Sequence, residues 1–180
     1  HGAPGGHHHR GPAEIAQIID GAAMTDGAKA IAHRMFGFVA DAEARAHGVP
    51  VGEVHFHEVG AVDSIADIIA IAVAADDLAP DGVVVSDLPC GYGTVRCQHG
   101  LIPVPAPATA FIAEAAGLTL SPVDVEGELV TPTGAAAAAA LRTEAALPER
   151  FSIKAIGMGA GKRAYDTPGI LRAMIIEPAE

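Results

Sequence analysis

The chain has 180 residues, of which 50% are hydrophobic and 4% aromatic, with no Trp. Its 22 acidic and 11 basic residues give a net charge of −11, which argues against nucleic acid or an anionic membrane as a partner. No signal peptide begins the chain, and its longest apolar run, residues 68–75, is too short to span a bilayer. The two cysteines do not make a disulfide framework. We therefore expect a soluble cytoplasmic protein and, because no Met begins the chain, a piece of a longer one.

Residues 1–12 hold His1, His7, His8 and His9 among Gly and Pro, without apolar periodicity. This composition predicts a flexible His-rich arm ahead of a single domain over residues 13–180. Such a tract is either a natural metal-gathering segment or the remainder of a purification tag.

The remaining chain alternates between helical and β-prone segments. Helical spacing, with Gly and Pro at the ends, predicts helices over residues 14–20, 26–47, 63–78, 106–116 and 132–146. The helix over 63–78 is apolar on nearly every side, so we expect it to be deeply buried. β-prone residues predict strands over 53–59, 83–86, 151–157 and 170–176, one or two within 118–130, and an irregular hairpin over 88–105. These elements predict an α+β fold, with a mixed sheet packed against Ala-rich helices; the alternative is an α/β fold with a mostly parallel sheet.

The segment His55-Phe-His-Glu58 is the first candidate metal site. In a strand, His55 and His57 share one face, and two neutral imidazoles suit a borderline transition metal. Glu58 and Asp63 lie at the turn from strand to helix, where ligands gather. The alternatives are structural histidines and an Asp63 that only caps the helix.

Asp67 lies four residues after Asp63, on the same face of the helix. Because that helix is otherwise apolar, we expect its carboxylate to be buried, where it needs a charge or several donors.

A second candidate site follows, within the segment 89–109. Cys97 and His99 share a strand face, and a thiolate with an imidazole would accept nickel or zinc. Gly91 and Gly93 let the backbone approach a ligand closely and expose amides to an anion. The alternative is a Gly-bulged hairpin with buried thiols.

Two further segments could bind anions. The run Gly157-Met-Gly-Ala-Gly-Lys-Arg163 lacks the Gly and the Ser or Thr that a P-loop requires. Lys162 and Arg163 could nevertheless hold a phosphate or carboxylate, unless the loop is a solvated turn. The segment Glu126-Gly-Glu-Leu-Val-Thr-Pro-Thr-Gly134 leads into a helix N-terminus, where free amides favour an anion. Ordinary helix capping explains most of this pattern, and only the two nearby carboxylates make a site conceivable.

Four segments together resemble one family, the nickel-insertion proteins called LarC. They are VHFHEVGAVDSIADI (54–68), HGLIPVPAPATA (99–110), EGELVTPTGAA (126–136) and GMGAGKRAYDTPGILR (157–172). The resemblance extends over nearly all of residues 7–177. Three features depart from the family: nothing like the Gly-Asp-Met segment near its start occurs here, Gly169 stands where Asn is usual, and family members continue past the position of Glu180 into a CTP-binding domain that the given residues do not include.

The resemblance implies a specific chemistry. Such proteins are nickel chelatases, or cyclometallases, of the lyase class. They insert nickel into pyridinium-3,5-bisthiocarboxylic acid mononucleotide and form a carbon–nickel bond and nickel–sulfur bonds. They hydrolyse CTP with the help of manganese or magnesium, and their product is the nickel-pincer nucleotide that lactate racemase and its relatives receive. The present chain then corresponds to the central part of such an enzyme and is expected to be inactive alone.

We therefore expect nickel to bind His55, His57 and Glu58, with Asp63 and Asp67 as further ligands or as groups that orient them. Cys97 and His99 form the reserve pair. The pincer precursor would contact the cofactor-binding set Gly91, Gly93, Lys162 and Arg163. The alternatives are a non-catalytic nickel-delivery module and a zinc-dependent hydrolase with Glu58 as base; whether the chain forms a homo-oligomer stays open.

Overall fold

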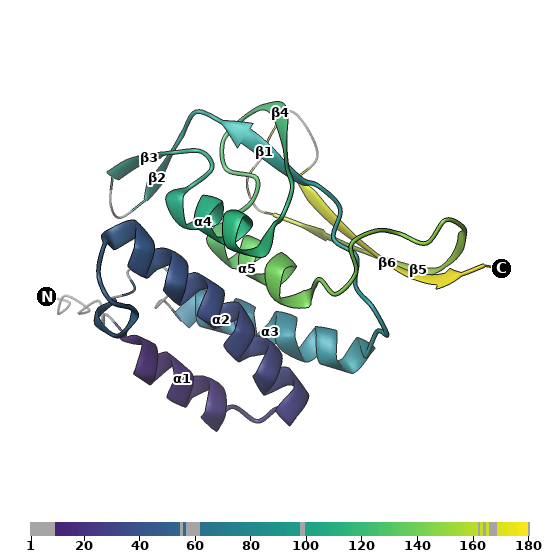
Figure 1. Ribbon diagram of the computed structural model, residues 1–180, viewed down its shortest axis with the longest axis horizontal. Helices are drawn as coiled ribbons and strands as arrows, with labels where there is room; N and C mark the ends of the chain where they lie inside the picture. The colour runs from purple at the N-terminus through teal and green to yellow at the C-terminus, as the bar shows by residue number, and fades with distance from the viewer. Residues whose placement is uncertain are drawn as a thin grey trace, which may run out of the picture.

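Helix α2 (Asp26–His47) lies at the centre of the packing. The computed structural model describes residues 10–54, 56, 62–97, 100–161, 163, 165 and 169–179. Around α2 lie α1 (Pro12–Gly21), the short 3-10 helix η1 (Val51–Glu53), α3 (Val62–Leu78), α4 (Pro107–Ala116) and α5 (Pro132–Leu141). Figure 1 shows these helices as one group, with the strands above it and to its right.

The ends of α2 follow from its terminal residues. The Thr25 hydroxyl accepts a hydrogen bond from the Ala28 amide at 3.1 Å and caps the first turn. Gly48 adopts the left-handed conformation, with φ of 67°, and ends the helix. The predicted bounds, 26–47, are therefore confirmed.

Among the described residues, the core consists of apolar side chains from α1, α2, α3, α4 and α5. Met35 and Val39 of α2 are fully buried, as are Ile15 and Ile19 of α1. Ala residues complete the contacts with the other helices, including Ala32, Ala72, Ala135 and Ala136, none of which has any exposed surface. Because alanine adds little bulk, these helices approach closely, as the Ala-rich composition predicts.

The strands in the part of the chain that the structure describes form three two-stranded sheets. β1 (Leu88–Tyr92) pairs in parallel with β4 (Leu120–Glu126). β2 (Thr94–Cys97) and β3 (Gly100–Pro103) form an antiparallel pair, as do β5 (Phe151–Ala160) and β6 (Ile170–Pro178). The α+β class is thus confirmed, with its parallel and antiparallel pairings divided among separate sheets.

Helix α3 is not buried on all sides. Ile65, Ile68 and Ala72 face the core, but Val62 is 65% exposed and Val73 is 42% exposed. The expectation of deep burial is therefore wrong: α3 packs against α2 and α5 along one face only. Across the described residues, no helix combines the length and the hydropathy that crossing a bilayer requires.

Helix α5 ends at Leu141, five residues before the predicted end at Ala146. The Arg142 backbone is extended, and its guanidinium donates to the Gly117 and Ala116 carbonyls at 2.9 and 2.6 Å. Those carbonyls lie at the C-terminus of α4, so Arg142 closes one helix and leaves the other. This long-range contact overrides the helical preference of the alanines.

Two predicted strands are not formed as expected. Within residues 83–86, only Val84 forms an isolated bridge, with Glu144. In the segment 53–59, Glu53 belongs to η1 and Phe56 bridges to Arg10; residues 55 and 57–59 lie outside the described residues.

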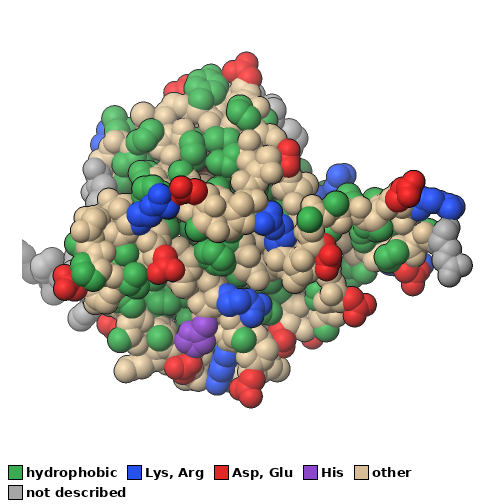
Figure 2. Space-filling view, viewed as in Figure 1, with side chains coloured by type: hydrophobic (Ala, Val, Ile, Leu, Met, Phe, Trp, Pro, Cys, Tyr) green, Lys and Arg blue, Asp and Glu red, His purple; other side chains and the backbone are tan. Residues whose placement is uncertain are grey.

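The β5–β6 ribbon differs from the rest of the fold. Met158 is 74% exposed and Leu171 is 76% exposed. Four isoleucines of the ribbon are between 49% and 57% exposed: Ile153, Ile156, Ile170 and Ile175. Within the described part of the chain, neither strand makes extensive contact with any other element. The ribbon extends to the right of the helices in Figures 1 and 2, with hydrophobic side chains visible along it.

Candidate functional site

The predicted histidine site falls mainly outside the described residues. His55, His57 and Glu58 are among those that the structure does not describe. Their neighbours Val54 and Phe56 are each 2% exposed, and the Phe56 ring meets that of Phe36 edge to face at 5.3 Å. Phe56 therefore packs against α2, and Val54 belongs to the buried core.

Asp63 and Asp67 lie in the first two turns of α3, and both are exposed. The expectation that Asp67 is a buried carboxylate is therefore wrong, because α3 turns that face towards solvent. Among the described residues, no three His, Cys, Asp or Glu side chains are grouped closely enough to hold a metal ion. The two carboxylates stay predicted ligands, since the histidines expected beside them are not described.

Gly91 lies at a close approach between β1 and the chain that follows β4. It is buried, and the register of the β1–β4 pair shifts between Cys90 and Tyr92. A Cβ atom at position 91 would lie 2.7 Å from the Val125 carbonyl oxygen and closer still to that of Gly127. The need for Gly at this position is therefore explained by the approach of the protein's own backbone.

The other predicted residues of this segment lie nearby in the chain. Gly93 has φ of 87°, in the left-handed region, and its carbonyl accepts from the Val104 amide at 3.0 Å. Cys97 is the half-buried last residue of β2, and His99 lies outside the described residues. The structure thus places Cys97 on a strand as predicted and leaves its pairing with His99 as a prediction.

Three of the predicted motifs meet around residues 127 and 128. We call this cluster, made of Gly91, Gly127, Glu128, Arg163 and Tyr165, the loop junction. Its charged pair is Arg163 Nη1 and Glu128 Oε2, 3.6 Å apart. The Glu128 side chain is only 9% exposed, whereas that of Arg163 is 58% exposed. A carboxylate so nearly buried needs a cationic partner, and Arg163 is one.

Tyr165 anchors the closing loop to this cluster. Its hydroxyl donates to the Glu128 carbonyl oxygen at 2.7 Å. Gly127 has φ of 126°, and a Cβ there would lie 2.9 Å from the Tyr165 ring. At the base of the loop, the Gly161 amide donates to the Gly169 carbonyl at 3.2 Å. The contacts of Tyr165 hold it against the chain after β4, and the hydrogen bond between Gly161 and Gly169 closes the base of the loop.

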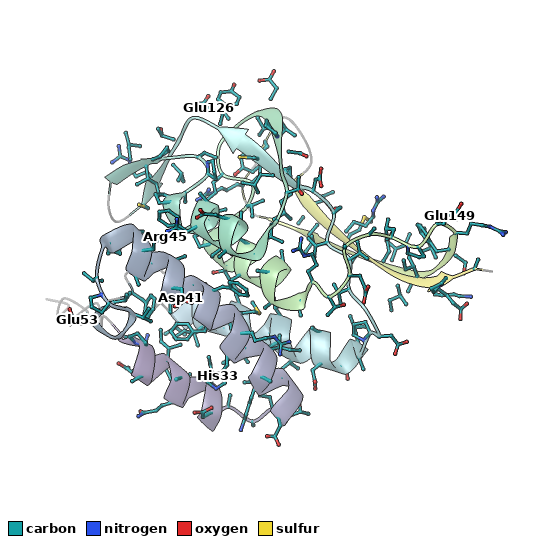
Figure 3. The ribbon with its side chains drawn as sticks, in the orientation of Figure 1. His33, Asp41, Arg45, Glu53, Glu126 and Glu149 are labelled. Atoms are coloured by element: carbon teal, nitrogen blue, oxygen red, sulfur yellow. The ribbon has the colours of Figure 1, made fainter. Side chains whose placement is uncertain are left out.

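The segment after Glu128 leads directly into α5. The Thr131 hydroxyl accepts from the Gly134 amide at 3.2 Å and caps the helix, so this part of the motif has the ordinary capping role. Thr109, buried completely in α4, donates to the Val130 carbonyl at 3.3 Å. Val130 and Thr131 therefore connect the chain after Glu128 to two helices, α4 and α5. Glu126, exposed at the end of β4, lies at the top edge of the molecule in Figure 3.

The loop junction offers a cationic group held beside a nearly buried anion. An arginine has five N–H donors in a planar fork, and the Arg163 side chain is 58% exposed, so a phosphate or carboxylate can reach it from solvent. Lys162, the other predicted cation, lies outside the described residues.

The sequence predicted Arg163 as an anion-binding residue, but it did not predict the roles of Glu128 and Tyr165. Two signals could have indicated them. Glu128 is an acidic residue between Gly127 and an apolar pair, and Tyr165 is one of only two tyrosines in the chain. Neither signal says that the two residues meet, because 37 residues separate them.

Comparison with known proteins gives matches that all carry a nickel-insertion description. The family model described as "Nickel insertion protein" matches residues 3–180. A pyridinium-3,5-bisthiocarboxylic acid mononucleotide nickel insertion protein of Alkaliphilus metalliredigens is 52% identical over 174 residues, which cover 96% of this chain and 41% of that protein. Proteins with the same description in Akkermansia muciniphila and Staphylococcus saprophyticus are 45% and 40% identical, over 99% and 93% of this chain.

The chain spans only about two fifths of the length of these curated relatives, between 41% and 44%. No solved structure matches it significantly.

Proposed function

The chain belongs to the nickel insertion protein family, and we propose that it forms the metal- and substrate-binding part of a protein that inserts nickel into pyridinium-3,5-bisthiocarboxylic acid mononucleotide. The observation that carries the proposal is the match of the family model to residues 3–180. The 52% identity to a relative described by that activity supports the same substrate. Nickel here is a substrate that leaves with the product.

Within this function, the chain's own residues divide the work. His55, His57 and Glu58 receive nickel, and the exposed carboxylates of Asp63 and Asp67 assist them. Cys97 and His99 are the reserve thiolate–imidazole pair. Arg163, a member of the loop junction, binds the phosphate of the mononucleotide together with Lys162. The half-exposed Arg163 guanidinium supports this last assignment, because it is accessible to an anion.

The relatives contain further residues beyond the part that this chain matches, and we assign the remaining steps of the reaction to such residues. We propose that the insertion reaction is that of a cyclometallase, that CTP hydrolysis with manganese or magnesium drives it outside residues 1–180, and that the isolated chain is inactive. The product would pass to a lactate racemase apoprotein or a relative. The cysteines Cys90 and Cys97 are thiols, which suits a reducing cytoplasm.

Nickel binding tests the metal assignment directly. The chain without residues 1–9 is dialysed against nickel or zinc, and bound metal is measured by mass spectrometry. We expect it to retain nickel in stoichiometric amount and to lose it when His55→Ala and His57→Ala are combined, because two imidazole ligands are removed.

The matched control removes two other histidines. His33 pairs with Asp20 at 2.7 Å and His47 with Glu43 at 3.5 Å, so the variant carrying His33→Ala and His47→Ala should keep its nickel. Unchanged nickel in the 55/57 variant would refute the assignment. Preference for zinc would favour the hydrolase instead, and nickel binding without turnover in the full-length protein would favour a delivery module.

A further inference from the structure

Tyr165 lies two residues after Arg163, in the same loop, and both contact Glu128. Arg163 meets the Glu128 carboxylate, whereas Tyr165 donates to the Glu128 backbone carbonyl at 2.7 Å. A single residue after β4 therefore receives two contacts from the loop, one ionic and one a neutral hydrogen bond.

The two contacts differ in how firmly they can hold the loop. The Arg163–Glu128 distance of 3.6 Å is beyond a hydrogen bond, and an arginine side chain loses much rotamer freedom when it is fixed. The Tyr165 contact is a hydrogen bond of good length made by a stiff aromatic side chain. Its ring also lies against Gly127, where a Cβ would be 2.9 Å away. Tyr165 is thus the better anchor.

We propose that Tyr165 is a positioning residue that holds Arg163 beside Glu128, ready to bind the phosphate of a pyridinium mononucleotide. This inference rests on the proposed function, in which Arg163 binds that phosphate. Fixing the backbone two residues away reduces the freedom that Arg163 loses on binding, and such preorganisation increases affinity without a new contact to the ligand.

The charge of Glu128 makes the hydroxyl of Tyr165 the cleaner place to test this. Removing the Glu128 carboxylate would release Arg163 but would also remove a negative charge that repels phosphate, so the two effects oppose each other. Tyr165→Phe removes one hydroxyl group and changes no charge. Tyr92→Phe is the matched control, since Tyr92 is 51% exposed and lies in β1.

The test is a double-mutant cycle with nicotinic acid mononucleotide as the probe, measured by titration calorimetry on the 180-residue chain. We expect Tyr165→Phe to weaken binding about fivefold, as the loss of one hydrogen bond implies. Tyr92→Phe should leave the affinity unchanged. In the Arg163→Ala background, Tyr165→Phe should have no further effect, because the residue that it positions is gone.

Each other outcome has a distinct meaning. If Tyr165→Phe weakened binding equally in the Arg163→Ala background, its role would be merely structural and the inference would be overturned. The same follows if Arg163→Ala weakened binding and Tyr165→Phe did not. If Arg163→Ala itself left the affinity unchanged, the proposed phosphate contact would fail first. Thermal unfolding of each variant shows whether it is folded.

Discussion

The helical core and the β5–β6 ribbon use apolar side chains in opposite ways. In the core, Ile68 and Met35 are 1% and 0% exposed, whereas in the ribbon Leu171 and Met158 are 76% and 74% exposed. Two-stranded ribbons have little stability of their own in water. The difference teaches that the stability of this chain is concentrated in its helices, while the ribbon carries the loop in which Arg163 and Tyr165 lie.

The largest expected effect separates the two regions by side-chain truncation. Ile68→Ala in α3 should lower the free energy of unfolding by about 2–5 kcal/mol, because it leaves a cavity in the core. Leu171→Ala in β6 should change it by no more than about 0.5 kcal/mol, since that side chain is already in water. Urea denaturation of both variants measures the two values. Equal losses would mean that the ribbon is as tightly packed as the helices.

A second prediction contrasts two glycines in strands. Gly91→Ala should destabilise the fold by about 1–3 kcal/mol, because its methyl group would press against backbone carbonyls that cannot turn away. Gly157→Ala, in β5, has no atom within 4 Å of the new methyl group and should be neutral or slightly stabilising. Thermal unfolding compares the two variants; a harmless Gly91→Ala would contradict the close approach of β1 to residues 125–127.

The smallest expected effect concerns an ion pair on the helical side. Arg45 of α2 hydrogen-bonds Glu114 of α4 and lies over the Phe111 ring, 4.3 Å from its centre; Figure 3 labels Arg45. The hydrogen bond and positive charge of Arg45 lower the pKa of Glu114. A lowered pKa stabilises the fold above the pKa of the unfolded chain, and this contribution is lost as pH falls through the folded value.

Glu114→Gln should therefore lower the melting temperature slightly at neutral pH. The difference from the parent chain should shrink as the solution is acidified through the lowered pKa, because the parent carboxylate becomes protonated. Because both groups are exposed, the effect should also weaken with added salt. A difference that grew on acidification would show that the ion pair is not its source.

The helices were predictable because their signals are local. Thr25 and Gly48 delimit α2 within the chain segment itself, and the apolar spacing of Met35, Phe36 and Val39 indicates its buried face. The end of α5 was not, because Arg142 leaves the helix to cap α4, a contact 25 residues away in the chain. The exposure of α3 was also missed, since composition indicates that a helix is apolar but not how many neighbours it has.

The candidate site was also predicted only in part, because residue type is a local signal and contacts between distant segments are not. Residue type marked Arg163 as an anion-binding group, and its position in the loop junction agrees with its being accessible. The roles of Glu128 and Tyr165 depend on a meeting of two segments that local pattern does not encode. The metal ligands His55, His57 and Glu58 stay predictions from spacing and family resemblance.

The hydrogen bond from Tyr165 to Glu128 also gives the molecule a built-in optical reporter. The chain contains two tyrosines and no tryptophan, so in a Tyr92→Phe variant the ultraviolet fluorescence arises almost entirely from Tyr165. Its emission would then follow the environment of a single hydroxyl at the loop junction. Events around Arg163 could be timed in solution by mixing experiments without attaching any dye.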